Sequence, residues 1–140
     1  MFSNVLTHIN WLHVVVAAVV YFALGAFWYS PAMFSRQWIK LVNLNMNDPN
    51  AKKGMGSLFA GSFLLIFILC FGLAVMQQVL PAIDLIGGIK LGLLMGICFA
   101  ATTMSVNYLY TKKPLLLYFI DGGYHIVGIA VASGIISGWH

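Results

Sequence analysis

The sequence contains no glutamate and only three aspartates, and charged side chains make up 7% of its 140 residues. A water-soluble domain usually has about a quarter of its residues charged. Hydrophobic residues account for 61% of this chain, which is more apolar surface than a soluble fold of this length can bury. The composition therefore excludes an ordinary soluble domain and predicts that the lipid bilayer surrounds the chain.

Positive charge is also sparse away from two short segments. Six of the seven Lys and Arg residues fall in 36–53 and 112–113, so the net charge of +4 does not form the kind of basic patch that binds nucleic acid. Cytoplasmic loops of membrane proteins carry an excess of Lys and Arg. We therefore expect connections 31–54 and 111–113 to be cytoplasmic, and both termini to lie outside a cell membrane.

Cysteine and catalytic motifs are equally scarce. The only two cysteines, Cys70 and Cys98, lie inside apolar runs without zinc-site spacing, so we interpret them as reduced packing residues. The chain has no nucleophile elbow, no HExxH and no glycine-rich phosphate loop. We therefore expect no metal, no cofactor and no catalytic residues, which makes an enzyme the least expected class. Intramembrane lipid chemistry by an Asp/His pair stays open.

Long apolar runs dominate what is present. A spanning helix needs about 20 apolar residues, and backbone groups in lipid must be satisfied within a helix. Residues 32–43 have Phe34 and Trp38 on one helical face and Arg36 and Lys40 on the other, which is typical of a helix lying on the membrane surface. The fold class predicted is all-α, a polytopic integral membrane protein with four transmembrane helices plus a short amphipathic surface helix after helix 1. The spans expected within one domain, 1–140, are 10–29, 55–80, 85–110 and 114–138.

Small residues recur at every fourth position in the third span. They let another helix approach closely, which favours helix association in lipid. The fourth span has a similar series at Ala130, Gly134 and Gly138. Either the two series face each other within one chain, or one of them forms a subunit interface. Because four short helices enclose little volume, we expect a homo-oligomer. The series in the third span consists of Gly88, Gly92, Gly96 and Ala100.

An acid and an imidazole interrupt the fourth span. Asp121 and His125 are, tyrosines aside, the only ionisable side chains between Lys113 and His140, and their spacing places them on one helical face. Such groups cost about 2.5–3.5 kcal/mol to insert and are functional candidates by default. One hypothesis is transport or conduction of a proton, ion or small solute, supported by Asn107, Tyr118 and Tyr29. The alternative is a structural or accessory protein.

In that alternative the polar residues only fix helix packing. Asp121 would then simply accept hydrogen bonds from neighbours such as Asn107, Tyr108 or Tyr118, and the protein would have no catalytic or transport role. The sequence leaves both hypotheses open, and the oligomer and the transported species are not specified by it.

The stretch LGAFWYSPAMFSRQWIKL, residues 24–41, is the most specific motif in the chain. It resembles the G-x-x-W-Y-[SG]-P-x-x-F-x-x-x-W signature of an uncharacterised bacterial family of four-helix membrane proteins, the domain of unknown function (DUF) 1761. The resemblance implies the same membrane architecture but no activity. Tyr29 and Ser30 either anchor the end of the first span at the interface, which we favour, or line the mouth of a cavity near Asn107, Tyr118 and Asp121. The matching residues are Gly25, Trp28, Tyr29, Ser30, Pro31, Phe34 and Trp38.

Overall fold

Four long apolar helices form the structure, a computed structural model that describes residues 2–42, 49–50, 53–81 and 83–138. The described residues contain no strand, so the predicted all-α polytopic fold is confirmed. Both ends of each predicted span lie within one residue of the ends of an observed helix or helical series. The helices long and apolar enough to cross a membrane are α2 (Trp11–Trp28), α4 (Met55–Val79), the continuous series α5 (Leu85–Met95), η1 (Gly96–Ala101) and α6 (Thr102–Tyr110), and α7 (Leu115–Gly138).

Two short helices accompany the spans. Helix α1 (Phe2–His8) was not expected, and it ends before Asn10, whose side chain accepts hydrogen bonds from the backbone of Leu12 and His13 and so caps α2. Helix α3 (Ser35–Leu41) is the predicted amphipathic helix, but it is shorter than 32–43, and residue 43 lies outside the described part of the chain.

The short connections follow local rules. Asp84 accepts a hydrogen bond from the backbone of Gly87 at 2.7 Å and caps α5, as its position after Pro81 predicts. In the sequence, Asn47 and Asp48 before Pro49 predict a cap for the second span, but residues 47–48 lie outside the described part of the chain. Helix α4 begins after Gly54, which has a φ of +79°. At the other tight turn Lys112 has a φ of 56°, and the next backbone N–H donates to the Tyr108 carbonyl at 3.0 Å, which closes the end of α6.

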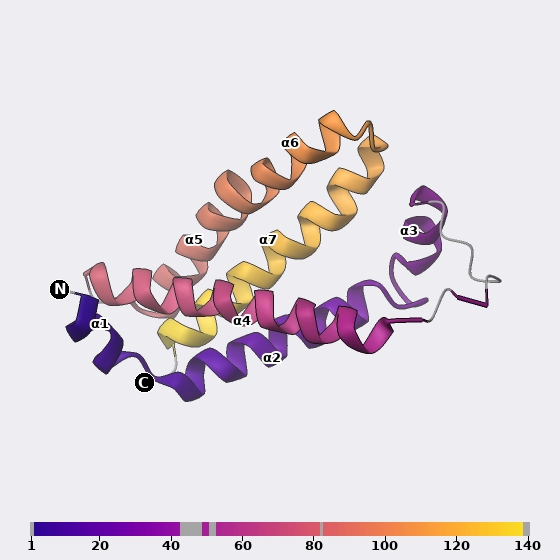
Figure 1. Cartoon of the computed structure of the whole chain (residues 1–140). Helices are drawn as coiled ribbons and strands as arrows, with labels where there is room; N and C mark the ends of the chain where they lie inside the picture. The colour runs from indigo at the N-terminus through magenta and orange to yellow at the C-terminus, as the bar shows by residue number, and fades with distance from the viewer. Residues whose placement is uncertain (1, 43–48, 51–52, 82, 139–140) are drawn as a thin grey trace.

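The helices form two antiparallel pairs, α2 with α4 and the α5–α6 series with α7 (Figure 1). Helix α7 packs on α2 as well as on α5, and it joins the two pairs. Helix α3 and the turn between α6 and α7 lie at one end of the molecule, and α1 and the start of α5 lie at the other. The alternation of four spans places these connections together, while the side of the membrane that they face stays a prediction.

The series of small residues brings α5 against α7 within the chain. A methyl group added to Gly92 would lie 2.6 Å from the Ala130 Cα, and one added to Gly96 would lie 2.9 Å from the Ile126 Cα. These distances show that the two backbones are in contact, so the first of the two alternatives for this series holds in the structure. A homo-oligomer stays a prediction, and it needs a surface other than this one.

Most of the buried core lies between α2, α4 and α7. Its largest fully buried side chains include Tyr21, Val14 and Cys70. Cys70 is the packing residue that was expected, whereas Cys98 is exposed on the surface of the isolated chain. Both are free thiols, so no disulfide joins the second and third spans.

Candidate functional site

Asp121 is the centre of a hydrogen-bond network between helices. Its side chain is 7% exposed, and Oδ1 accepts a hydrogen bond from the Tyr29 hydroxyl at 2.5 Å. Oδ2 accepts a second, short hydrogen bond from the Tyr108 hydroxyl. Tyr29 follows the end of α2 and Tyr108 lies in α6, so the carboxylate connects both helices to α7. We call Asp121, Tyr29 and Tyr108 the carboxylate cluster.

His125 lies one turn further along α7, near its middle, and has a tyrosine partner of its own. The Tyr21 hydroxyl lies 2.6 Å from His125 Nδ1, and the ring tautomer decides which group donates. Asp121 and His125 share a face, as the spacing predicted, but both direct their hydrogen bonds to tyrosines of other helices. The four-residue spacing therefore identified the two groups and not their partners.

Tyr21 is a site residue that sequence reasoning missed, as is Thr103 in the cleft described below. Tyr21 lies four residues before Gly25 and seven before Trp28, so helical spacing places it on the same face as the family motif. That spacing was the available signal. The tyrosine itself looked like an ordinary aromatic residue in an apolar run, because its histidine partner is 104 positions away in the sequence.

Helices α2 and α7 cross through a reciprocal tyrosine–glycine contact. The Tyr124 ring lies over Gly25, where an added methyl group would come within 2.6 Å of the hydroxyl oxygen. The Tyr21 ring lies over Gly128 in the same way, at 2.7 Å. The two rings pack edge to face with centroids 5.3 Å apart, and the Tyr124 hydroxyl donates to the Tyr21 carbonyl at 3.1 Å. Gly25 and Gly128 provide the space that these rings need.

The rest of the family motif also contacts α7 or supports residues that do. The Trp28 indole N–H donates to the Ile120 carbonyl at 2.9 Å, and the Phe34 ring lies 5.1 Å from the Trp28 ring. The Trp38 ring of α3 packs against Tyr29 at 5.5 Å. The motif therefore holds the segment of α7 that carries Asp121, while the interfacial anchor that we favoured stays a prediction.

Within the motif, Ser30 and Pro31 form the turn that leads to α3. The Ser30 carbonyl accepts hydrogen bonds from the backbone of Met33 at 3.0 Å and Ser35 at 3.2 Å, and its hydroxyl donates to Phe27. Pro31 is exposed. These bonds set the direction in which α3 leaves α2, and so they bring Trp38 against Tyr29.

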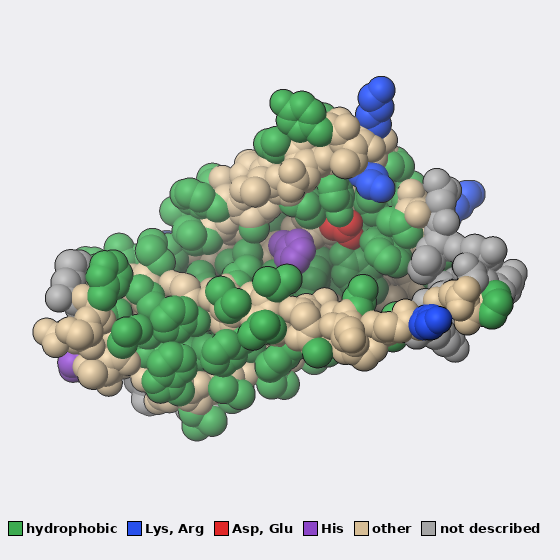
Figure 2. All heavy atoms as spheres, in the orientation of Figure 1, with side chains coloured by type: hydrophobic (Ala, Val, Ile, Leu, Met, Phe, Trp, Pro, Cys, Tyr) green, Lys and Arg blue, Asp and Glu red, His purple; other side chains and the backbone are tan. Residues whose placement is uncertain are grey.

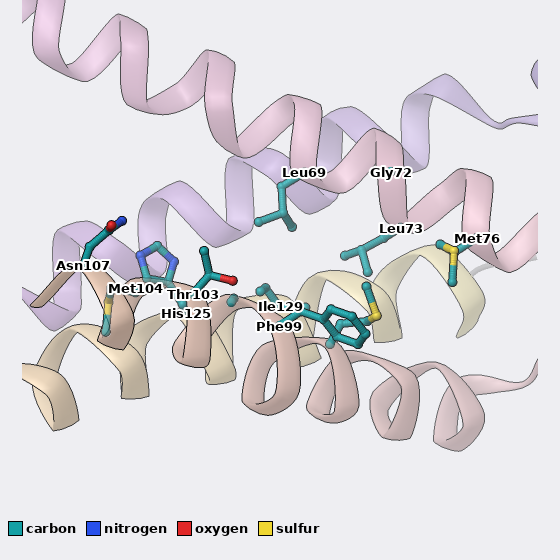
Figure 3. A pocket seen from close by; sticks show the side chains of 12 residues that line it. Leu69, Gly72, Leu73, Met76, Phe99, Thr103, Met104, Asn107, His125 and Ile129 are labelled. Atoms are coloured by element: carbon teal, nitrogen blue, oxygen red, sulfur yellow. The ribbon is translucent and has the colours of Figure 1, made fainter. Parts of the chain in front are cut away.

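A cleft of about 660 Å³ lies between α4 on one side and the α5–α6 series on the other, with α7 as its floor. Figure 2 looks into this hollow, where a histidine side chain and, beside it, an acidic one are surrounded by hydrophobic side chains. His125 and Asn107 line the cleft, and Thr103 lies near them (Figure 3). Of the predicted supporting residues, Tyr29 contacts Asp121 directly, whereas the Tyr118 ring packs against the Tyr108 ring with centroids 5.5 Å apart.

Helix α4 is joined to α7 at the end nearer the 81–84 turn. There the Gln77 amide of α4 donates to the carbonyl of Ser133 at 2.9 Å and to its hydroxyl at 2.8 Å. Toward the other end α4 and α6 diverge (Figure 1). One wall includes the π-helical turn η1, in which the hydrogen bonding of the helix is altered and which supplies Phe99 and Ala100 to the cleft. Such turns occur frequently at functional sites.

Four spanning helices with an ionisable site in the last define a small multi-pass helical protein, compatible in length and composition with a membrane. The chain belongs to the DUF1761 family, a protein family of unknown function, whose sequence model matches residues 12–137. No curated protein and no solved structure matches the chain. The matched region contains the motif on α2 and the segment of α7 that it contacts, so the two halves of the site fall within the family's own boundaries.

Proposed function

We propose that this protein conducts protons across the bilayer through Asp121 and His125, and that a small solute binds in the adjoining cleft. The position of His125 carries the proposal, because the imidazole is part of the cleft floor and lies one helical turn from a buried carboxylate. Ionisable side chains inside a spanning helix are costly, and in known membrane proteins they mark ion and proton pathways.

The location of the cleft supports a transport role. Substrate sites of secondary transporters lie near the middle of the bilayer, where two groups of helices meet. Here the cleft separates two helix pairs, and His125 lies about 15 Å along α7 from its first residue. The carboxylate cluster lies closer to the basic connections, and in the orientation that their charge predicts this end faces the cytoplasm.

The alternative is a structural or accessory membrane protein with no catalytic role. One observation favours it: both oxygens of Asp121 accept hydrogen bonds from tyrosine hydroxyls, so the carboxylate has its partners within the chain. A buried polar group of this kind can hold three helices together without any transport. The two proposals differ in the effect of Asp121→Asn: the first expects this variant to stop proton movement, and the second expects no proton movement in the parent protein.

Proton flux into reconstituted liposomes tests the first proposal. The protein is placed in liposomes that contain a pH-sensitive dye, and a potassium diffusion potential drives protons inward. We expect acidification faster than in protein-free liposomes, and we expect Asp121→Asn to return the rate to the protein-free level. Asp84→Asn is the matched control, since Asp84 is exposed and asparagine caps a helix as well as aspartate does.

Two results contradict the proposal: no flux above protein-free liposomes, or undiminished flux in Asp121→Asn. Thermal unfolding of the same preparations in detergent identifies the alternative. If Asp121→Asn unfolds at a much lower temperature than Asp84→Asn, while the parent protein moves no protons, the carboxylate cluster is structural.

A further inference from the structure

The lining of the cleft is divided by polarity. The polar side chains Thr103, Asn107 and His125 lie together at one end, and apolar side chains line the remainder (Figure 3). None of the described residues that line the cleft is a lysine, an arginine or a carboxylate. The apolar part includes Leu69, Leu73, Met76, Met95, Phe99 and Ile129.

We propose that the cleft binds an uncharged amphiphile, with its hydroxyl or carbonyl head at Thr103, Asn107 and His125 and its apolar chain along α4 and η1. A volume of about 660 Å³ lies within the range of about 300–1,000 Å³ that small-molecule sites occupy. Such sites are mostly apolar with a few placed polar groups, and this cleft has that composition.

Neutral heads fit this polar end better than anionic ones. Thr103 and Asn107 present a hydroxyl and an amide, which donate to or accept from a hydroxyl or carbonyl oxygen. Tyr21 contacts His125 through Nδ1, so Nε2 is the ring nitrogen for the head to meet. The Asp121 carboxylate lies one turn away on the same face, and it repels an anionic head.

The two side chains of α6 also need a partner of this kind. Thr103 and Asn107 are exposed in the isolated chain, although they lie in a helix long and apolar enough to cross a membrane. A polar group that faces hydrocarbon without a hydrogen bond is costly. The head of an amphiphile bound in the cleft would supply those hydrogen bonds.

The opening of the cleft indicates where the ligand comes from. Gln77 and Ser133 join α4 to α7 at one end, and α4 and α6 diverge from there (Figure 1). Figure 2 shows the hollow open at the surface of the molecule, and the surface between two membrane-spanning helices faces the bilayer. A ligand that enters by this route must dissolve in lipid, which agrees with the apolar lining and with an uncharged head.

A photoreactive monoacylglycerol tests the inference. The probe carries a diazirine in its acyl chain and is added to the full chain in phosphatidylcholine vesicles, and labelled peptides are then identified by mass spectrometry. We expect labelling of α4 and η1 that unlabelled monoacylglycerol competes away. A fatty acid with the same diazirine chain, which is anionic, should label these segments at least several-fold less.

Two variants on the described helices locate the site. Gly72 lines the cleft, and a methyl group added there would meet no atom within 4 Å, so Gly72→Phe should place its ring in the cleft and lower labelling by about tenfold or more. Gly61→Phe is the control, because a methyl group added at Gly61 of the same helix also meets no atom within 4 Å, and Gly61 does not line the cleft. Thr103→Val, which keeps the shape of the side chain, should lower labelling by about threefold to tenfold.

The inference is wrong if the fatty acid labels the cleft as strongly as the monoacylglycerol, or if labelling is the same in Gly72→Phe and Gly61→Phe. It is also wrong if the parent protein is not labelled and Gly72→Phe changes its oligomeric mass in detergent, since a helix of a second copy then occupies the cleft. This inference rests on the proposed function at one point only: the amphiphile is the small solute that the proposal places in the cleft. Labelling without proton flux overturns the transport role alone, and flux without labelling overturns this inference alone.

Discussion

Helix α7 makes two close contacts of opposite character. Against α5 it has glycine, alanine and serine, and the backbones touch, with an added methyl group on Gly92 only 2.6 Å from the Ala130 Cα. Against α2 it has Tyr124, whose ring lies over Gly25, and the ionisable pair Asp121 and His125 with tyrosine partners. The first contact depends on the absence of side chains, and the second depends on hydrogen bonds between large ones.

The difference explains where a site can form. A contact between small residues leaves no room for a ligand and no polar group to bind one. The contact with α2 fixes the direction of His125 through Tyr21. The cleft lies next to this contact, between α4 and the α5–α6 series. The α5 contact therefore holds the helix pair together, while the α2 contact positions the side chains that carry the proposed chemistry.

The largest effect is expected from a bulky residue in the small-residue contact. Gly92→Ile places atoms where the Ala130 Cα and the Ile129 carbonyl now lie, and both are backbone atoms that cannot move aside alone. We expect the free energy of unfolding in detergent micelles to fall by about 3 kcal/mol or more, the upper range for overpacking. Gly61→Ala is the control, since nothing lies within 4 Å of its added methyl group. Equal stability of the two variants would contradict this account of α5 and α7.

An intermediate effect is expected in the carboxylate cluster. Tyr29→Phe removes the hydrogen bond to Asp121 and leaves a buried carboxylate oxygen with one partner fewer. The expected loss is about 1.5–3 kcal/mol of unfolding free energy, typical of hydrogen bonds to charged groups. Tyr118→Phe keeps the ring contact with Tyr108 and should change stability by less than about 0.5 kcal/mol. If the two variants unfold alike in the same assay, the Tyr29 hydroxyl does not hold α2 to α7.

The smallest effect is expected at Trp28 of the family motif. Trp28→Phe removes the indole hydrogen bond to the Ile120 carbonyl and keeps an aromatic ring beside Phe34. We expect a loss of about 1 kcal/mol. In a double variant with Tyr29→Phe, the loss of unfolding free energy should differ from the sum of the two single losses by at least about 0.5 kcal/mol. Both hydrogen bonds hold the same segment of α7, so their contributions should be coupled. Strict additivity would mean that Trp28 acts only as an interfacial anchor.

Much of the fold was predictable because its determinants are local. Apolar runs of the required length predicted the spans. The cap residue Asp84 and the segment TKKP, residues 111–114, are typical of tight turns by their own chemistry. Helix α1 was not predicted, because its seven residues mix polar and apolar side chains without a periodic pattern. Helix α3 was predicted too long, because a pattern over seven residues does not mark where a helix ends. Periodicity weakens over two turns of helix, so short elements have indistinct ends.

The candidate site was predictable in part. Asp121 and His125 stand out in any apolar run, and Tyr29 was named as a supporting residue through the motif. Tyr108 was named only as one of three neighbours that could hydrogen-bond Asp121, and Tyr21 was not named at all. A tyrosine in a membrane helix is common enough that its type carries no signal, and only its neighbour makes it part of a site.

The sequence by itself determined that this chain has four spanning helices, where they begin and end, and which two ionisable groups lie on one face of the last, because helix formation and transfer from water depend on residues near in sequence. The tertiary structure alone decided that Tyr29 and Tyr108 contact Asp121, that Tyr21 contacts His125, and that α4 and α6 diverge around the cleft. Helical periodicity fixes which residues share a face, but the choice of the facing helix depends on how all four pack together.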